Sequence, residues 1–139
     1  MVSRVVACAL LPAFVIALNG CKAAAQPGAP LSKIEVTDPR YKDLVFLVAT
    51  VRRAGNDFVI TNDSTQPWFD VTLVLAGASR EYRWQLSEVD AGQTVRASAA
   101  QFADASGMAF DPVREMPNTL IVSAEIGEGG PTGVYGVHL

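Results

Sequence analysis

Short alternations of apolar and polar residues recur along the chain after residue 43 and predict β-strands. The clearest lies at 80–86, where three large apolar residues alternate with three charged or polar ones. A period of two places the apolar residues on one face, so the segment predicts a strand with one buried and one solvated face. Burial of Tyr82, Trp84 and Leu86 contributes about 1.5–3 kcal/mol per side chain, which makes this stripe a candidate centre of the core.

Five further strands are predicted from apolar runs and the turn signals between them. Residues 44–53 (LVFLVATVRR) are rich in β-branched residues and apolar on both faces, which suits a strand covered on both sides. The turn signal at 54–57 (AGND) makes 58–61 the paired strand of a hairpin. Residues 68–76 (WFDVTLVLA) and 119–126 (TLIVSAEI) are the other two internal strands, and residues 134–139 form the last one.

Two segments stay ambiguous. Ile34 to Lys42 alternates irregularly and predicts either an edge strand or a lead-in to the domain. Thr94 to Phe102 is interpreted as a strand, although good helix formers over 94–105 leave a helix open. Polar or glycine-rich loops are predicted at 62–67, 90–92, 106–117 and 127–133.

Seven or eight short strands with turn signals about every ten residues predict an all-β domain over residues 34–139, an antiparallel β-sandwich of about seven strands. The stretch FVITNDSTQPWFDVTLVL from Phe58, with the AGQT turn and QFADASGMAFDP, resembles small immunoglobulin-like domains of uncharacterised bacterial membrane-anchored proteins. The resemblance covers most of residues 44–139. This part of the chain lacks the cysteine pair of true immunoglobulin domains. It implies an immunoglobulin-like fold with no activity attached.

The first twenty residues have the composition of a secretory leader. A positive start at Arg4 precedes an uncharged apolar run over residues 5–18, broken only by Pro12. The run is shorter than the ~20 apolar residues of a membrane helix. Residues 1–20 are therefore predicted to be a signal peptide that is removed.

The end of this leader, Leu18-Asn19-Gly20-Cys21, resembles the lipobox of bacterial lipoproteins. The resemblance implies cleavage between Gly20 and Cys21, a diacylglyceryl group on the Cys21 sulfur and acylation of the new amine. Two or three acyl chains hold a protein stably on a membrane, whereas one binds it only marginally. An ordinary signal peptide with a chance cysteine beside its end is the alternative.

Residues 21–33 are predicted to be the lipidated cysteine and a flexible tether. Residues 22–32 (KAAAQPGAPLS) have no apolar period, and their prolines would soon end any short helix over 22–26. Lys22 stands where the resemblance would place an aspartate as an inner-membrane retention signal. The absence of that aspartate favours the outer membrane over the inner one. The expected location is therefore the periplasmic face of the bacterial cell envelope.

Charge and cysteine content narrow the functional classes. The whole chain has a formal net charge of −3 and loses one basic residue, Arg4, with the leader, which leaves −4. That sign opposes nucleic-acid binding, which uses basic patches. Cys8 leaves with the leader and Cys21 takes the lipid, so the domain has no cysteine for a disulfide. Apolar burial and backbone pairing must hold it together.

Candidate catalytic and metal-binding chemistry is sparse. The one histidine, His138, lies next to the C-terminus, and neither a Ser-His-Asp triad nor a zinc site is evident around it. Asp104, Ser106 and Asp111 do not match a calcium loop and are interpreted as turn residues. Asn62-Asp63-Ser64 has the form of a glycosylation sequon and is likewise interpreted as a loop. We expect neither an enzyme nor a cofactor.

The remaining candidate residues are ones that could bind another protein. Trp68 and Phe69 stand beside the 62–67 loop and are either an interaction surface or an inward-facing cap on the sandwich. Sheet edges offer a second way to bind a partner. The sequence therefore predicts a lipid-anchored envelope protein that is a non-enzymatic binding or structural module and acts through its loops or a sheet edge, with any envelope protein partner unidentified. A small envelope hydrolase and an accessory subunit of an envelope complex are the alternatives.

Overall fold

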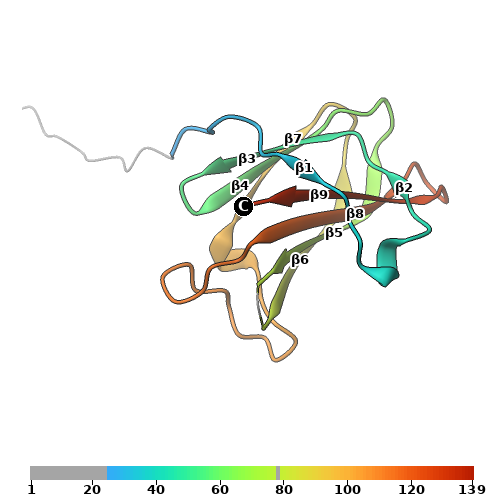
Figure 1. Cartoon of the computed structure of the whole chain (residues 1–139). Coiled ribbons are helices and arrows are strands. Elements are labelled where there is room, and N and C mark those ends of the chain that lie inside the picture. Colours follow the sequence, from blue (N-terminus) through green and yellow to red (C-terminus); the bar gives the residue numbers. More distant parts are fainter. Residues whose placement is uncertain (1–24, 78) are drawn as a thin grey trace, which may run out of the picture.

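The computed structural model describes residues 25–77 and 79–139, and these form the predicted β-sandwich of two sheets packed face to face (Figure 1). The large sheet has the order β1-β9-β8-β5-β6, with β2 also paired to β9, and the small sheet has the order β3-β4-β7. The strands are β1 (Lys33–Ile34), β2 (Val45–Phe46), β3 (Ala49–Ala54), β4 (Asp57–Asn62), β5 (Trp68–Ala76), β6 (Glu81–Val89), β7 (Thr94–Ser98), β8 (Thr119–Ile126) and β9 (Thr132–His138). Two short 3-10 turns, η1 (Pro39–Tyr41) and η2 (Ala99–Gln101), complete the elements described.

The main core lies between the two sheets. Val51, Phe58 and Ile60 from the small sheet face Leu73 and Leu120 of the large one, all at most 2% exposed. The stripe of β6 is less central than the sequence predicted. Tyr82 is buried, but Trp84 and Leu86 are only partly so. The reason is that β6 is the last strand of its sheet, so the centre of the core falls on β5 and β8.

The outer face of the large sheet has a second, smaller cluster. Val74, Ile121 and Val134 are buried there because residues 35–44 cross this face and pack on it. The apolar residues that this crossing segment, the strap, contributes are Val36, Tyr41 and Leu44. The irregular segment 34–42 is thus a lead-in that covers β5, β8 and β9, with only Ile34 in a strand.

The single strand predicted at 44–53 is wrong, because the chain changes sheets within it. β2 pairs parallel with β9 in the large sheet, whereas β3 pairs with β4 in the small one. Leu47, at the crossing, is 2% exposed and donates its N–H to the Val134 carbonyl at 3.0 Å. Val45, Phe46 and Val48 are exposed. Apolar residues on both alternating faces hid the change of direction.

The ambiguous segment at 94–102 is a strand that ends in a turn. β7 covers residues 94–98, and η2 follows, with the Ser98 N–H bonded to the Gln101 Oε1 at 2.8 Å. This turn sends Phe102 back into the core, where its ring meets Phe58 edge-on at 6.1 Å. The helix formers of this stretch therefore make one short turn.

The part of the predicted tether that the structure describes is bonded to the domain from Gly28 onward. The Gly28 N–H donates to the Arg53 carbonyl at 2.8 Å and the Leu31 N–H to the Val51 carbonyl at 2.7 Å. Pro30 lies opposite Arg52 between them. These bonds extend the small sheet past β3, and the chain continues directly into β1 on the edge of β9.

Candidate functional site

Gly20 and Cys21, the predicted cleavage and lipid-attachment residues, lie outside the described residues. The described chain begins at Ala25, whose carbonyl accepts the Arg96 Nη1 at 3.1 Å and whose side chain lies beside Gly55 in the β3–β4 turn. Within the residues that the structure describes, no helix is long and apolar enough to cross a membrane.

Trp68 is fully buried, whereas Phe69 is partly exposed. The ladder between β5 and β8 shifts register between Phe69 and Thr72, where Asp70 has a positive φ of 47°. This bulge adds one residue, so Trp68 and Val71 both face the core although they are three residues apart. Trp68 therefore closes the end of the sandwich, and of the two candidate interaction residues only Phe69 has accessible surface. The Trp68 Nε1 has no hydrogen-bond partner among the described atoms.

Asn62 is the one buried polar residue recorded in the described core. Its Nδ2 donates to the carbonyls of Gln66 at 2.9 Å, Asp90 at 3.1 Å and Val89 at 3.2 Å. Its Oδ1 accepts the Ser64 N–H at 3.0 Å and the Ser64 hydroxyl at 2.6 Å. The sequon-like motif thus ties the β4–β5 loop to the β6–β7 turn, and its amide is not available to solvent.

The outer edge of β6 is open along part of its length. Near its start, Arg83 exchanges two backbone hydrogen bonds with Ala103, at 2.8 and 3.1 Å. Because strand geometry repeats every two residues, the N–H and C=O groups of Gln85 and Ser87 point to this same edge. Both residues are exposed, and among the described segments only β5 is paired with this part of β6. Four main-chain groups are left for a partner.

The edges on the opposite side of the sandwich are covered by the chain itself. Residues 28–31 lie along β3, and β1 and β2 occupy successive parts of the outer edge of β9, one antiparallel and one parallel. A single continuous segment joins these contacts, so the covered outer edges of β3 and β9 form one side of the sandwich. We call it the covered side, and the side that exposes β6 and β7 the open side.

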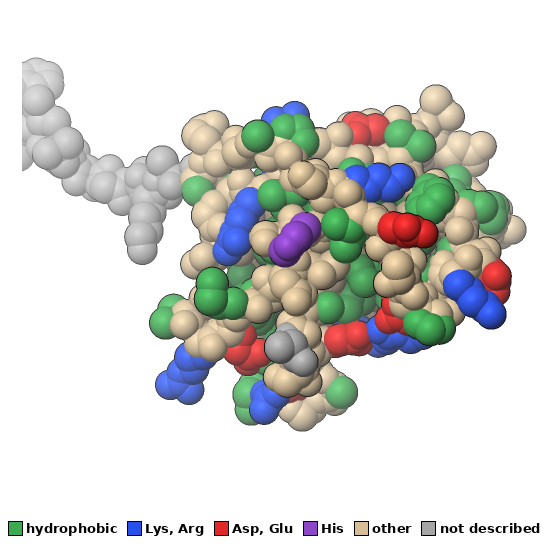
Figure 2. Space-filling view, in the orientation of Figure 1, with side chains coloured by type: hydrophobic (Ala, Val, Ile, Leu, Met, Phe, Trp, Pro, Cys, Tyr) green, Lys and Arg blue, Asp and Glu red, His purple; other side chains and the backbone are tan. Residues whose placement is uncertain are grey.

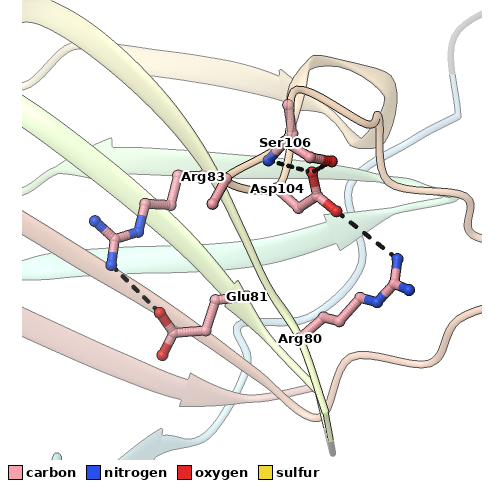
Figure 3. A pocket seen from close by; sticks show the side chains of 7 residues that line it. Arg80, Glu81, Arg83, Asp104 and Ser106 are labelled. Atoms are coloured by element: carbon pink, nitrogen blue, oxygen red, sulfur yellow. Dashed lines mark hydrogen bonds and ion pairs between the residues drawn. The ribbon is translucent and has the colours of Figure 1, made fainter.

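A pocket of about 730 Å³ lies beside the open edge of β6 (Figure 3). Its lining residues are Arg80, Glu81, Arg83, Ala103, Asp104, Ala105 and Ser106. Figure 3 shows two ion pairs facing one another across it, with Arg83 on Glu81 at 3.3 Å and Arg80 on Asp104 at 3.7 Å. Since each cation faces a carboxylate, the pocket offers alternating charges and suits a polar peptide side chain better than a simple anion.

Glu81 also joins the strap to β6. The Arg40 Nη2 lies 2.6 Å from Glu81 Oε1 and 2.6 Å from Asp38 Oδ2, so one guanidinium holds two carboxylates. These hydrogen bonds lower the pKa of both Asp38 and Glu81 and raise the pKa of Arg40. The arrangement keeps these three groups charged at neutral pH.

The Asp104 carboxylate is used to build the loop beside the pocket. Its Oδ1 accepts the Ser106 hydroxyl at 2.6 Å, the Ser106 N–H at 2.9 Å and the Met108 N–H at 3.0 Å, and the first of these bonds is the main reason that the pKa of Asp104 is lowered. Gly107 takes the positive φ of 85° that this turn needs. Over residues 25–77 and 79–139 no group of three potential metal ligands comes together.

His138 is exposed on β9, and its Nδ1 lies 2.8 Å from the Asn118 carbonyl oxygen. The backbone around it is fixed, because its N–H donates to the Ser32 carbonyl at 3.2 Å and Leu139 N–H donates to Asn118. Within the described atoms, no carboxylate forms a hydrogen bond or ion pair with the ring. Its observed partner is the main chain.

Comparison with known proteins yields no relative: no family model, no curated protein and no solved structure matches the chain. The candidate site therefore depends on geometry alone. Sequence reasoning did not find the Arg40–Glu81 pair or the structural role of Asn62. Asp38-Pro39-Arg40 carries a local signal, because aspartate before proline often starts a turn, but its partner lies 41 residues away.

Proposed function

We propose that the protein is a lipid-anchored, non-enzymatic binding module of the bacterial cell envelope that holds an extended segment of a partner protein along the open edge of β6. The anchor is supported by the leader and the Leu18–Cys21 motif. The edge is supported by one observation, the unequal coverage of the two sides of the sandwich. Unpaired strand edges favour further strand pairing, and proteins usually cover those that have no use.

The geometry of β6 suits such a partner. An added strand pairs through main-chain groups, which gives affinity for many sequences, while nearby pockets select side chains. Gln85 and Ser87 supply the main-chain groups, and the pocket at Arg80, Arg83 and Asp104 lies at the end of the same edge. A partner side chain with a polar or zwitterionic end would meet both signs of charge there.

The two alternatives differ in what supports them. An accessory subunit of an envelope complex would use the same edge, and the identity of the partner distinguishes it from a stand-alone binder. The small-hydrolase alternative gains no support from His138, because the ring bonds to a main-chain carbonyl. A panel of ester, peptide and glycan substrates would revive it if turnover depended on an Asp or Glu of the domain.

The anchor is tested by Cys21→Ser in the full chain. Lipidation predicts that the native protein fractionates with membranes and carries the mass of its acyl chains. The variant should lose that mass and remain soluble or uncleaved. Recovery of Cys21→Ser in the membrane fraction at the normal mature mass would refute the anchor.

The edge is tested by a photo-cross-linking amino acid at Gln85 in the native cell, combined with two substitutions at Ser87. Ser87→Pro removes an N–H that points away from β5, and proline is tolerated at such edge positions. Ser87→Ala keeps the N–H and is the matched control. We expect a discrete cross-linked partner in the native protein and in Ser87→Ala, with strong loss in Ser87→Pro. Equal cross-linking in both variants would show that strand addition is not the mode of binding.

A further inference from the structure

Two fully exposed apolar side chains stand at one end of the sandwich. Val113 and Met116, in the loop between η2 and β8, are each 91% exposed. The loop packs against the β3–β4 turn, because Pro112 and Met116 line one small pocket together with Arg53 and Asn56. Hydrophobic and basic side chains are visible together at this end of the molecule (Figure 2). Exposed apolar side chains in such positions commonly mark a contact surface.

The described chain begins at this same end. Ala25 is held there by Arg96 and lies beside Gly55, and Figure 1 shows the blue start of the ribbon and the orange loop on the same side. Cys21 precedes Ala25 by four residues, which span at most ~14 Å when fully extended. The nine residues of β5 reach about 30 Å. A membrane anchor at Cys21 therefore brings the end with Val113 near the bilayer, and an upright domain keeps the opposite end away from it.

We propose that this end, which we call the anchor end, rests on the lipid bilayer, with the side chains of Val113 and Met116 in the interfacial region. Apolar side chains bordered by arginines are the composition that interfacial membrane contacts use. Arg53 is exposed beside them, and the Arg114 side chain, 85% exposed, makes only a 3.5 Å contact with Asp111. The orientation rests on the lipid anchor of the proposed function and adds to it the face that meets the membrane.

The orientation also has a consequence for binding. The start of β6 lies beside Gly77 and Arg80, which share a pocket with Met116, and the strand runs toward Asp90, whose carbonyl accepts a hydrogen bond from Asn62. With the anchor end on the bilayer, Gln85 and Ser87 lie part of the way up the domain. The open edge of β6 then points sideways, parallel to the membrane plane, and remains accessible to a partner in the envelope.

The test uses the native acylated protein in vesicles of phosphatidylethanolamine and phosphatidylglycerol, some with brominated acyl chains. Because the domain has no cysteine of its own, a thiol placed at one position carries a single environment-sensitive fluorophore. Val113→Cys puts the probe on the anchor end. Glu128→Cys puts the same probe on the exposed β8–β9 turn at the opposite end and is the matched control.

We expect the probe at position 113 to be quenched several-fold more by brominated lipid than the probe at 128, with a blue-shifted emission that soluble quenchers affect less. Equal behaviour of the two probes on an acylated protein overturns the orientation and leaves the anchor standing. A protein whose mass shows no acyl chains overturns the anchor and, with it, the orientation argued from it. The mass of each labelled sample separates these two results.

Discussion

The covered and open sides of the sandwich differ in whether the outer edges of their strands are paired. On the covered side, residues 28–34 and β2 pair with the outer edges of β3 and β9. On the open side, the long strand β6 is paired at Arg83, while Gln85 and Ser87 keep their edge groups free. β6 has nine residues and β9 has seven, so the longer of these two edge-bearing strands is the one left partly unpaired.

The segment over residues 28–44 is part of the fold. It brings Leu31 to the main core and Val36 to the outer cluster, and it occupies the edges where another chain would otherwise pair. Free edges are a route to aggregation, and proteins usually shorten, charge or cover them. Because the edges of β3 and β9 are covered, the open edge of β6 on the opposite side is the place to look for a partner.

The largest expected effect comes from breaking the covered side at Leu47, where the chain passes from one sheet to the other. Leu47→Ala removes a side chain that is 2% exposed and should lower the free energy of unfolding by about 2–5 kcal/mol. Val48→Ala, next to it and 60% exposed, should change it by less than about 0.5 kcal/mol. Chemical denaturation measures both, and equal losses would contradict this account of the crossing.

A smaller effect is expected where the strap meets β9. A Cβ at Gly136 would lie 2.7 Å from the Val36 Cγ2, so Gly136→Ala should cost about 1–3 kcal/mol of unfolding free energy. Val36→Ala in the same chain should recover part of that loss, which a double-mutant cycle detects. Gly28→Ala is the control, since its new Cβ meets nothing closer than the Arg53 carbonyl at 3.4 Å. No coupling between positions 36 and 136 would refute the packing.

The strap is joined to the open side by Arg40 and Glu81, and this link should be weak. Glu81→Gln should lower the unfolding free energy by about 1 kcal/mol or less, because the pair is partly exposed and screened by salt. The folded pKa of Glu81 lies below its ordinary 4.5, so the contribution is present above pH 4.5 and lost as the pH falls through the lowered value. Glu88→Gln, also on β6, is the control. If Glu81→Gln remained less stable than the native protein at high salt, or at a pH below the lowered pKa of Glu81, the ion-pair explanation would be contradicted.

The smallest perturbation is none at all, because hydrogen exchange of the unmodified protein compares the two sides directly. Amide hydrogen exchange of the native domain should find the N–H groups of Leu31 and Leu47 protected, because each donates to a carbonyl. The N–H groups of Gln85 and Ser87 should exchange as exposed amides do, and a bound partner strand should slow them. Strong protection of Ser87 in the free protein would mean that the edge is already closed.

The sequence predicted best those elements whose signals are local. β5 and β8 have the predicted bounds, because an alternating or continuous apolar run ends at turn residues on both sides. Asn62 and Asp70 show what alternation misses. Asn62 is a polar residue that is fully buried, and two of its hydrogen-bond partners, the carbonyls of Val89 and Asp90, are distant in sequence. Asp70 lies in the bulge that turns Trp68 inward.

Other features required contacts that no local pattern encodes. The sheet change at Leu47 lies inside an apolar run that reads equally well as one strand. The strap on Val74, Ile121 and Val134 depends on packing between segments far apart in the chain. The open edge is defined by where other strands do not pair, so it becomes visible only when the sheet order is known.

The path of residues 28–34 also determines how the domain resists mechanical load. A pull on residue 25 acts along β3, and the hydrogen bonds of Gly28 and Leu31 lie across that direction. The load then acts in shear on the hydrogen bonds of Gly28 and Leu31 and on those between β1 and β9. In that geometry the bonds must break together, not one after another. A domain pulled between its N-terminal end and a partner on β6 would carry the force through both sheets before the first strand came loose.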